Sequence, residues 1–172
     1  MLGTHARGFF SDGLEEETRF VWDGSHLLQE VQPDGRYTYL YTDPDSYEPL
    51  AQVRNWTNED GESKQEIHYF HCDQIGIPRE MTDKDGNLVW FGNYTGWGRL
   101  KEETKVTDSA YQPFRLQNQY ADRETGLYYN FFRYYEPDAA LPKWIAYGVL
   151  GTAPLSKPRI PLKDIQPDPI DW

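Results

Sequence analysis

The sequence predicts a mainly β chain built from many short strands. Trp, Tyr and Phe make up 16% of its 172 residues, with 13 tyrosines among them, and these side chains suit half-buried pleated surfaces. Fourteen glycines and 12 prolines supply frequent turns. Asp-Gly pairs recur along the first half of the chain, and such a pair between alternating runs is a strong hairpin signal. We therefore expect serial antiparallel hairpins that form a curved open sheet, with one or two short helices in the C-terminal third.

The Asp-Gly pairs place the expected strands. They stand at residues 12–13, 23–24, 34–35, 60–61 and 85–86. A two-residue type I′ turn needs positive φ at both central residues, which Asp-Gly provides. The flanking runs predict strands over residues 18–22, 27–31, 36–41, 50–56, 65–71, 77–82 and 88–94. In the third of these, Tyr37, Tyr39 and Tyr41 share one face. Units of this kind are stable only when they stack on their neighbours.

The rest of the chain has a different pattern. Residues 111–124 lack a period of two and predict a short helix or an irregular connection. Residues 127–135 predict one aromatic strand, residues 141–151 a second short helix, and the proline-rich remainder an extended tail. We divide the chain into an N-terminal extension (1–17), a repeat core (18–138) and a divergent tail (139–172).

Charge and composition exclude several classes of function. The formal net charge of −11 argues against a nucleic-acid partner, which requires a basic surface. No apolar stretch approaches the roughly 20 residues of a membrane-spanning helix. The N-terminus lacks a secretory signal, so we expect a cytoplasmic location unless a specialised system exports the protein. The single cysteine excludes an intrachain disulfide and a multi-cysteine zinc site, and we expect no cofactor.

Candidate catalytic and metal-binding residues are few. His68, His71 and Cys72 lie within five residues, but in a strand His71 points away from the other two, so we predict neither a metal site nor a reactive thiol. Ser46 and Ser109 have no evident base. Aspartic protease chemistry needs two paired carboxylates. The Asp-Pro sequences at residues 43–45 and 168–169 are the nearest approach to it.

Three tryptophans leave a binding function open. Trp56, Trp90 and Trp97 alternate with polar residues and could stack on sugars. We favour the reading in which these rings pack between hairpins. A carbohydrate- or surface-binding module is the alternative.

Three segments carry a resemblance to a known family. Residues 94–100, Tyr-Thr-Gly-Trp-Gly-Arg-Leu, resemble the Tyr-Asp-x-x-Gly-Arg-Leu unit of the YD repeat, with Thr95 where Asp usually stands. Residues 69–83 resemble the signature Tyr-x-His-x-Asp-x-x-Gly-x-Pro-x-Glu-x-Thr-Asp of the Rhs repeat-associated core. Residues 115–137 are similar to the segment that closes this core. The resemblance covers about residues 18–138.

The resemblance implies a structural role. Rhs proteins are large bacterial proteins whose YD repeats spiral into a hollow shell around a C-terminal toxin, delivered to neighbouring cells, often by type VI secretion. The core closes the shell and is followed by an Asp-Pro-x-Gly segment associated with self-cleavage by aspartates. After Asp138 this sequence leaves the family pattern, and residues 168–171, Asp-Pro-Ile-Asp, lack the glycine. Such a break is typical of a truncated or rearranged fragment.

We therefore expect a structural fragment of a toxin-enclosing shell without activity of its own. The resemblance implies the remaining shell, its toxin and possible secretion-apparatus proteins as partners, with no nucleic acid and no membrane span. An aspartate-dependent autoprotease segment and a minimal effector in residues 139–172 are further alternatives. The residues expected to matter are structural: Gly24, Gly35, Gly61, His71, Asp73, Gly76, Pro78, Gly86, Tyr94, Gly98, Arg99, Gly126, Tyr128, Tyr134 and Tyr135.

Overall fold

The computed structural model describes residues 2–11, 14–116, 118–123, 125–130, 133–138 and 143–146. Side chains are described from residue 18 to residue 138. The described strands are β1 (Leu2–Ser11), β2 (Leu14–Asp23), β3 (His26–Gln32), β4 (Gly35–Tyr41), β5 (Pro49–Thr57), β6 (Ser63–Cys72), β7 (Pro78–Thr82), β8 (Leu88–Tyr94), β9 (Leu100–Lys105), β10 (Tyr120–Ala121), β11 (Tyr128–Asn130), β12 (Arg133–Glu136) and β13 (Lys143–Ala146).

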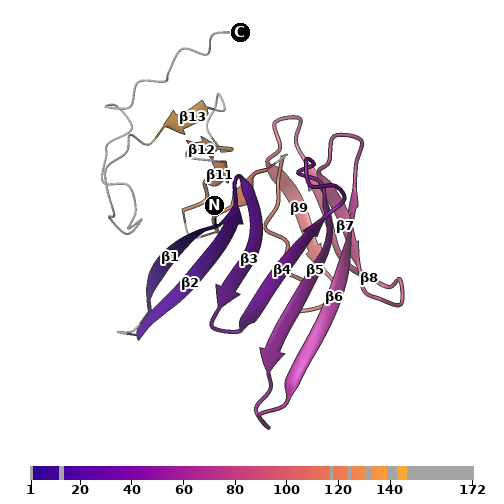
Figure 1. The fold of residues 1–172 in the computed structure, drawn as a ribbon. Helices are drawn as coiled ribbons and strands as arrows, with labels where there is room; N and C mark the ends of the chain where they lie inside the picture. The colour runs from indigo at the N-terminus through magenta and orange to yellow at the C-terminus, as the bar shows by residue number, and fades with distance from the viewer. Residues whose placement is uncertain are drawn as a thin grey trace.

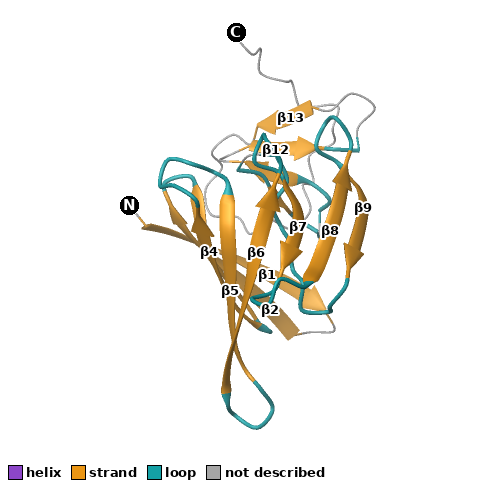
Figure 2. Cartoon of the chain, turned by 90° about the vertical axis from the view of Figure 1, so that its right-hand side faces the viewer, coloured by secondary structure: helices purple, strands orange, loops and turns teal. Residues whose placement is uncertain are grey.

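The strands form two sheets. Strands β1 to β9 lie side by side in chain order, each antiparallel to the next, and β10 to β13 form a smaller antiparallel sheet. The larger sheet is strongly curved, and the chain after β9 returns along its concave side (Figures 1 and 2). The predicted serial hairpins and curved open sheet are confirmed. The division into residues 1–17, 18–138 and 139–172 stays a prediction, although β1 pairs with β2 along its length.

The two candidate helices of the C-terminal third have different outcomes. The described residues contain no helix, and therefore none that could cross a membrane. Of the two alternatives for residues 111–124, the described residues form the irregular connection, in which Arg115 N–H donates to the Gln119 carbonyl and Asn118 takes a φ of 59°. Most of the expected helix over 141–151 lies outside the described residues, but Lys143–Ala146 is a strand.

The predicted aromatic strand over residues 127–135 is also wrong as a single strand. It is a hairpin of β11 and β12, in which Tyr128 pairs with Tyr135 and Tyr129 with Tyr134. The ring centroids of the second pair lie 5.3 Å apart. Cross-strand aromatic pairs stabilise a hairpin, and a single straight strand would separate these rings.

Four hairpins of the large sheet close through the same five-residue turn. The N–H of its first residue donates to the carbonyl of the fifth, and the N–H of the glycine at position four donates to the carbonyl of the first. The four turns span residues 58–62, 73–77, 83–87 and 95–99. Among the described residues, Asn118 is the only non-glycine with positive φ, so the predicted type I′ geometry is wrong for the Asp-Gly pairs at residues 23–24, 34–35, 60–61 and 85–86. The pair at residues 12–13 lies outside the described residues. In three of the four turns, the residue three positions before the glycine has a side chain that accepts a backbone N–H bond. These residues are Asn58, Asp73 and Asp83, and their bonds favour the five-residue turn over the two-residue type I′ turn.

The core lies on the concave face of the large sheet. Tyr37 and Tyr39 of β4 are buried there and Tyr41 packs against the same cluster, as the alternation predicted. The cluster contains buried residues of β2, β3, β4, β6, β7 and β8, and it is completed from outside the sheet by Ala110 and Phe114. The returning chain is therefore part of the core.

Candidate functional site

The candidate site is the place where the chain after β9 crosses the concave face. We call residues 107–116 and 118–123 the return segment. Phe114 is its apolar anchor: its ring meets Tyr39 at 4.8 Å and Phe70 at 5.7 Å between centroids, both edge to face. These rings come from β4 and β6, so one side chain of the return segment packs against both strands.

A buried carboxylate fixes the same segment from the other side. Glu30 of β3 is completely buried, at 0% exposure. Its Oε1 accepts hydrogen bonds from the hydroxyls of Tyr111 (3.0 Å) and Tyr120 (2.8 Å), and its Oε2 accepts one from Tyr39 (3.0 Å). Tyr111 and Tyr120 are 81 and 90 residues away in sequence. Glu30 therefore joins the start of the sheet to the segment that leaves its end.

The electrostatics of this cluster follow from burial. Burial raises the pKa of Glu30, although the hydrogen bonds from Tyr120, Gln32, Tyr111 and Tyr39 oppose this effect. Burial, followed by the nearby Glu30 carboxyl, also holds the pKa of Tyr39 well above its ordinary value. The hydroxyls consequently stay protonated and act as donors, which is the role that the Glu30 oxygens require.

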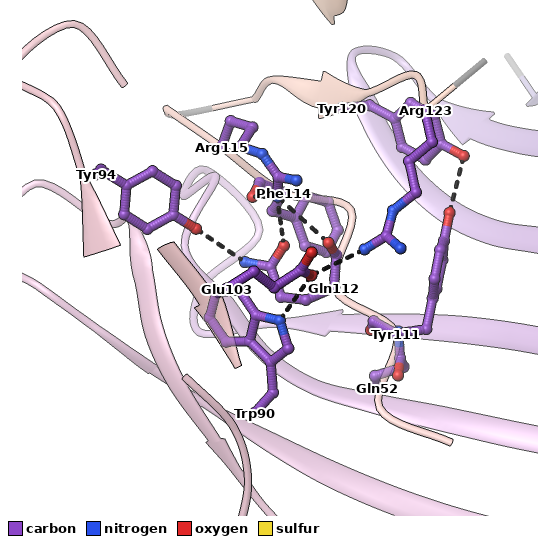
Figure 3. A network of polar contacts seen from close by, with 10 residues as sticks. All are labelled: Gln52, Trp90, Tyr94, Glu103, Tyr111, Gln112, Phe114, Arg115, Tyr120 and Arg123. Carbon is purple, nitrogen blue, oxygen red and sulfur yellow. Dashed lines mark hydrogen bonds and ion pairs between the residues drawn. The ribbon is translucent and has the colours of Figure 1, made fainter. Parts of the chain in front are cut away.

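Further polar contacts hold the segment near β8 and β9 (Figure 3). Glu103 of β9 accepts from the Trp90 indole (2.9 Å) and from Arg123 (3.0 Å) on the same oxygen. The Arg115 guanidinium, 4% exposed, donates to the side-chain oxygen of Gln112 (2.9 Å) and to the Phe114 carbonyl (2.7 Å). The return segment is thus bonded to β3 at one side of the curved sheet and to β9 at the other.

The small sheet is attached through the turn over residues 95–99. The Tyr135 hydroxyl donates to the Trp97 carbonyl (3.0 Å), and the Leu100 N–H donates to the Tyr128 hydroxyl (3.3 Å). Arg99 forms an exposed ion pair with Asp138 at 3.2 Å. A Cβ at Gly98 would lie 2.6 Å from the Leu116 side chain, so this glycine allows the return segment to approach the turn closely.

The sequence-predicted structural residues fall into two groups, and their importance stays a prediction. Those in turns have positive φ: Gly24, Gly35, Gly61, Gly76, Gly86, Gly98 and Gly126. The remaining ones lie in the hairpins that carry the resemblance: His71, Asp73, Pro78, Tyr94, Arg99, Tyr128, Tyr134 and Tyr135. Asp73 illustrates their local roles, because its carboxylate accepts from two backbone N–H groups of its own turn and from Arg79.

The structure separates the candidate metal ligands. His68 is buried on the concave face, whereas the exposed His71 hydrogen-bonds to Thr82 at 2.9 Å. Burial, followed by the nearby acids Glu48 and Asp73, raises the pKa of the Cys72 thiol to about 12. In the described part of the chain, no three His, Cys, Asp or Glu residues are placed to hold a metal ion.

The candidate nucleophile and aspartates have structural surroundings. The Ser109 hydroxyl donates to the Glu66 carboxylate (3.3 Å), so the acid stands between it and His68, and a serine–histidine relay is not formed. Asp43 accepts the Asp45 N–H on an exposed loop. Residues 168–169 lie outside the described residues. The autoprotease and effector alternatives therefore stay predictions.

The tryptophans differ from one another. Trp90 is fully buried, and Trp56 is half-buried with the Arg54 guanidinium 4.7 Å from its ring centroid. Trp97 is 68% exposed. Of the three, Trp97 keeps a ring face available for a ligand.

Sequence reasoning missed the residues that hold the return segment. The alternation predicts an ordinary strand residue at Glu30, and Tyr111 and Tyr120 fall in the stretch expected to be a short helix or an irregular connection. The sequence carries no signal for Glu30, which lies three residues after Leu27 in a bulged strand where the structure buries both side chains. A bulge changes which face a residue occupies, and the printed sequence does not mark it.

The fold and the return segment define a class: a curved sheet of serial β-hairpins closed by its own C-terminal part. A crystal structure of TcdB2-TccC3-TEV has a similar fold, with a TM-score of 0.52 and 17% identity over 78% of this chain and 7% of that one. A sequence model described as RHS protein matches residues 67–104.

Two curated relatives support the same assignment. Double-stranded DNA deaminase toxin A of Burkholderia cenocepacia is 38% identical over 133 residues, which cover 72% of this chain and 9% of the relative. Toxin protein Tse5 of Pseudomonas aeruginosa is 32% identical over 157 residues, which cover 78% of this chain and 12% of the relative. The chain belongs to the Rhs family. It spans about a tenth of the length of these relatives.

Proposed function

We propose that this chain is the closing part of a toxin-holding shell in a larger Rhs protein, and that it contributes structure and no catalysis of its own. The observation that carries the proposal is the return segment, which is bonded to β3 and β9 across the concave face. A shell must present a continuous sheet outside and be sealed inside, and a segment fixed in this way supplies the seal.

The type of bonding supports a fixed closure. Phe114 supplies apolar contact, which is strong but has little directionality. The tyrosine bonds to Glu30 are directional and buried, so they select one position of the segment on the sheet. The relatives are named as toxins and are far longer than this chain, which is consistent with a shell and a toxin encoded elsewhere in a parent protein.

A chimera tests the proposal. Residues 18–138 would replace the matching segment of the Burkholderia relative, and limited trypsin digestion would measure protection of the sequence that follows. We expect the chimera to protect that sequence as the unmodified relative does. Combining Glu30→Gln with Tyr111→Phe and Tyr120→Phe should lose the protection, because the three changes remove the hydrogen bonds between the return segment and Glu30 of β3.

The matched control is Lys64→Ala, which removes an exposed ion pair with Glu62 far from the segment. It should leave protection unchanged. A chimera that folds but leaves the following sequence as sensitive to trypsin as in an unfolded sample would contradict the proposal.

A surface-binding role is the second candidate, favoured by the 68% exposure of Trp97. The Tyr135 hydroxyl donates to the Trp97 carbonyl, which ties the backbone of this turn to the small sheet. Titration with bacterial surface glycans should shift tryptophan fluorescence, and Trp97→Ala should abolish the shift. An unchanged spectrum across the titration would remove this candidate.

A further inference from the structure

Two turns at one end of the large sheet carry large apolar side chains. The five-residue turns between β6 and β7 and between β8 and β9 place Ile75 and Trp97 at the same third position, where they are 51% and 68% exposed. The matching turns at the opposite end place the exposed acids Asp60 and Asp85 at this position. Asp is an ordinary turn residue, whereas Ile and Trp are not. We call Ile75 and Trp97 the turn tips, and their exposure points to a contact with another segment.

The two turn tips are neighbours on one end of the sheet. Strands β6 to β9 are adjacent and antiparallel, so the two turns lie at the same end and two strand spacings apart. Neighbouring strands are about 4.8 Å apart, which puts the centres of the turns about 10 Å from each other. The surface therefore fits an elongated ligand that carries two apolar groups at about this spacing.

The same chain contains a segment with this property. Residues 157–163, which lie outside the described residues, have the sequence Lys-Pro-Arg-Ile-Pro-Leu-Lys. Prolines favour the polyproline II conformation, which has three residues per turn and a rise of about 3.1 Å per residue. In that conformation Pro158 and Pro161 share one side and are about 9 Å apart. Proline-rich segments of this kind dock on surfaces that present aromatic side chains.

The described part of the chain leads this segment to the end that carries the turn tips. The Tyr135 hydroxyl of β12 donates to the Trp97 carbonyl, and β12 pairs with β13. Figure 2 shows β12 and β13 beyond this end of the large sheet. Pro158 follows Ala146, the last residue of β13, by 12 residues, and an extended chain of that length spans about 40 Å. The chain between them therefore starts beside one turn tip and is long enough to reach both.

Charge favours the same pairing. Residues 157–163 carry three positive charges and no negative one, in a chain whose net charge is −11. At this end of the sheet Asp43 and Asp45 are exposed in the loop between β4 and β5, and the Asp138 side chain is 72% exposed. A second copy of the whole chain would instead bring like net charges together, which disfavours it as the occupant.

We propose that residues 157–163 bind across the turn tips, with Pro158 and Pro161 against Ile75 and Trp97 and the basic side chains toward the neighbouring acids. This contact fixes the C-terminal part of the chain over one end of the sheet. It also covers the Trp97 ring, so it competes with a glycan for the same surface. The proposal does not depend on the shell function, because both surfaces belong to this chain.

Limited trypsin digestion of the full chain tests the contact. Trypsin cuts after Arg159 and Lys163, and a bound segment resists cleavage at both bonds. A partner on the same chain has an effective concentration on the order of 1 mM, so a contact with a Kd of about 100 μM keeps the segment bound about nine-tenths of the time. Replacing both turn tips, Ile75→Ser with Trp97→Ser, should therefore raise the rate of cleavage about tenfold.

The matched control changes the same turn position at the opposite end. Asp60→Ser combined with Asp85→Ser should leave the rate of cleavage after Arg159 unchanged. Because all four positions are exposed and the turn glycines are kept, both double variants should retain the circular dichroism spectrum of the native protein. Equal cleavage rates in the native protein and the turn-tip variant would overturn the proposal. Protection that is lost on dilution would assign the contact to a second copy of the chain and would also overturn it.

A second measurement leaves the sheet unchanged. In a nitrogen-15 NMR spectrum of the full chain, the indole N–H signal of Trp97 is identified by its absence in Trp97→Phe. Replacing both prolines, Pro158→Ala with Pro161→Ala, should shift this signal, because the rings that cover the indole are removed. A Trp97 signal that does not move would show that the segment lies elsewhere.

Discussion

Replacing Glu30 by Gln is the most direct perturbation of the closure. The side chain keeps its size but loses its charge and one acceptor oxygen. In the native protein Oε2 accepts from Tyr39, and Oε1 accepts from Tyr111 and Tyr120. The amide nitrogen of Gln would face a hydroxyl that donates, so at least one tyrosine must turn or lose its partner.

The magnitude follows from that loss. A buried donor or acceptor left without its partner costs about 1–3 kcal/mol, and the Tyr hydroxyls are partly able to reorient. We therefore expect the free energy of unfolding to fall by about 1–3 kcal/mol at pH 7. For a chain of this size, that lowers Tm by about 3–10 °C. Thermal unfolding followed by circular dichroism measures the change.

The dependence on pH distinguishes the role of Glu30 from a general loss of packing. Burial raises its folded pKa above the ordinary value of 4.5, so the folded chain binds this proton more tightly than the unfolded chain. The resulting stability is fully present below pH 4.5 and is lost as pH rises through the folded pKa. Gln does not titrate, so the Tm difference between the native protein and Glu30→Gln should be larger at pH 4.5 than at pH 8.

Either of two results would refute this reasoning. If the native protein and Glu30→Gln had the same Tm at pH 4.5 and also at pH 8, the Glu30 bonds would contribute nothing to stability. A difference that grows as pH rises would mean that the folded state prefers the ionised carboxylate. Tyr120→Phe provides the partner control, because it removes one hydroxyl while leaving the carboxyl in place.

Three other predictions concern the turns and the thiol. Gly98→Ala should destabilise the chain by about 1–3 kcal/mol more than Gly61→Ala. Both glycines have φ near 80°, but only at Gly98 would a Cβ lie against Leu116. Equal urea midpoints for the two variants would contradict the close approach of Leu116 to Gly98. Cys72 should resist iodoacetamide at pH 8 until urea unfolds the chain, since its pKa is about 12, and rapid labelling of the folded protein would contradict its burial. Burial raises the pKa of Asp73, but the backbone N–H bonds and Arg79 outweigh this effect and lower the pKa overall. Asp73→Asn should therefore lower Tm at pH 7, and the Tm difference from the native protein should vanish as pH falls through the folded pKa. A Tm difference that does not depend on pH would refute this prediction.

The sequence predicted the strands because their information is local. Alternation and turn glycines placed β2 to β8, and Tyr37, Tyr39 and Tyr41 lie on the predicted face. The turn type was wrong because four of the hairpins close through five-residue turns, and in three of these the Asp or Asn side chain three residues before the glycine accepts a backbone N–H bond. The break between β11 and β12 was missed because the pairing of four tyrosines is a tertiary preference that overrides an unbroken β-rich run.

The candidate site could not be predicted in the same way. The path of the return segment depends on contacts between Glu30 and tyrosines 81 and 90 residues away. Nothing in the local sequence of residues 111–120 indicates which strand they will meet, and loop closure over such distances is governed by the whole sheet. The resemblance to Rhs proteins indicated a closing role for this region, but not the carboxylate that holds it.

The pairing of an apolar anchor with a buried carboxylate explains how a loop with so little regular structure can be fixed. Phe114 would retain much of its contact if the segment moved by part of a residue, since apolar packing is tolerant of small shifts. The hydroxyls of Tyr111 and Tyr120 reach one Glu30 oxygen at 3.0 and 2.8 Å, a geometry that a shifted segment cannot keep. A buried carboxyl that loses these donors is costly, so misplaced arrangements are penalised more than the correct one is stabilised. Glu30 therefore acts mainly by excluding other positions of the segment, which is the property that a closure requires.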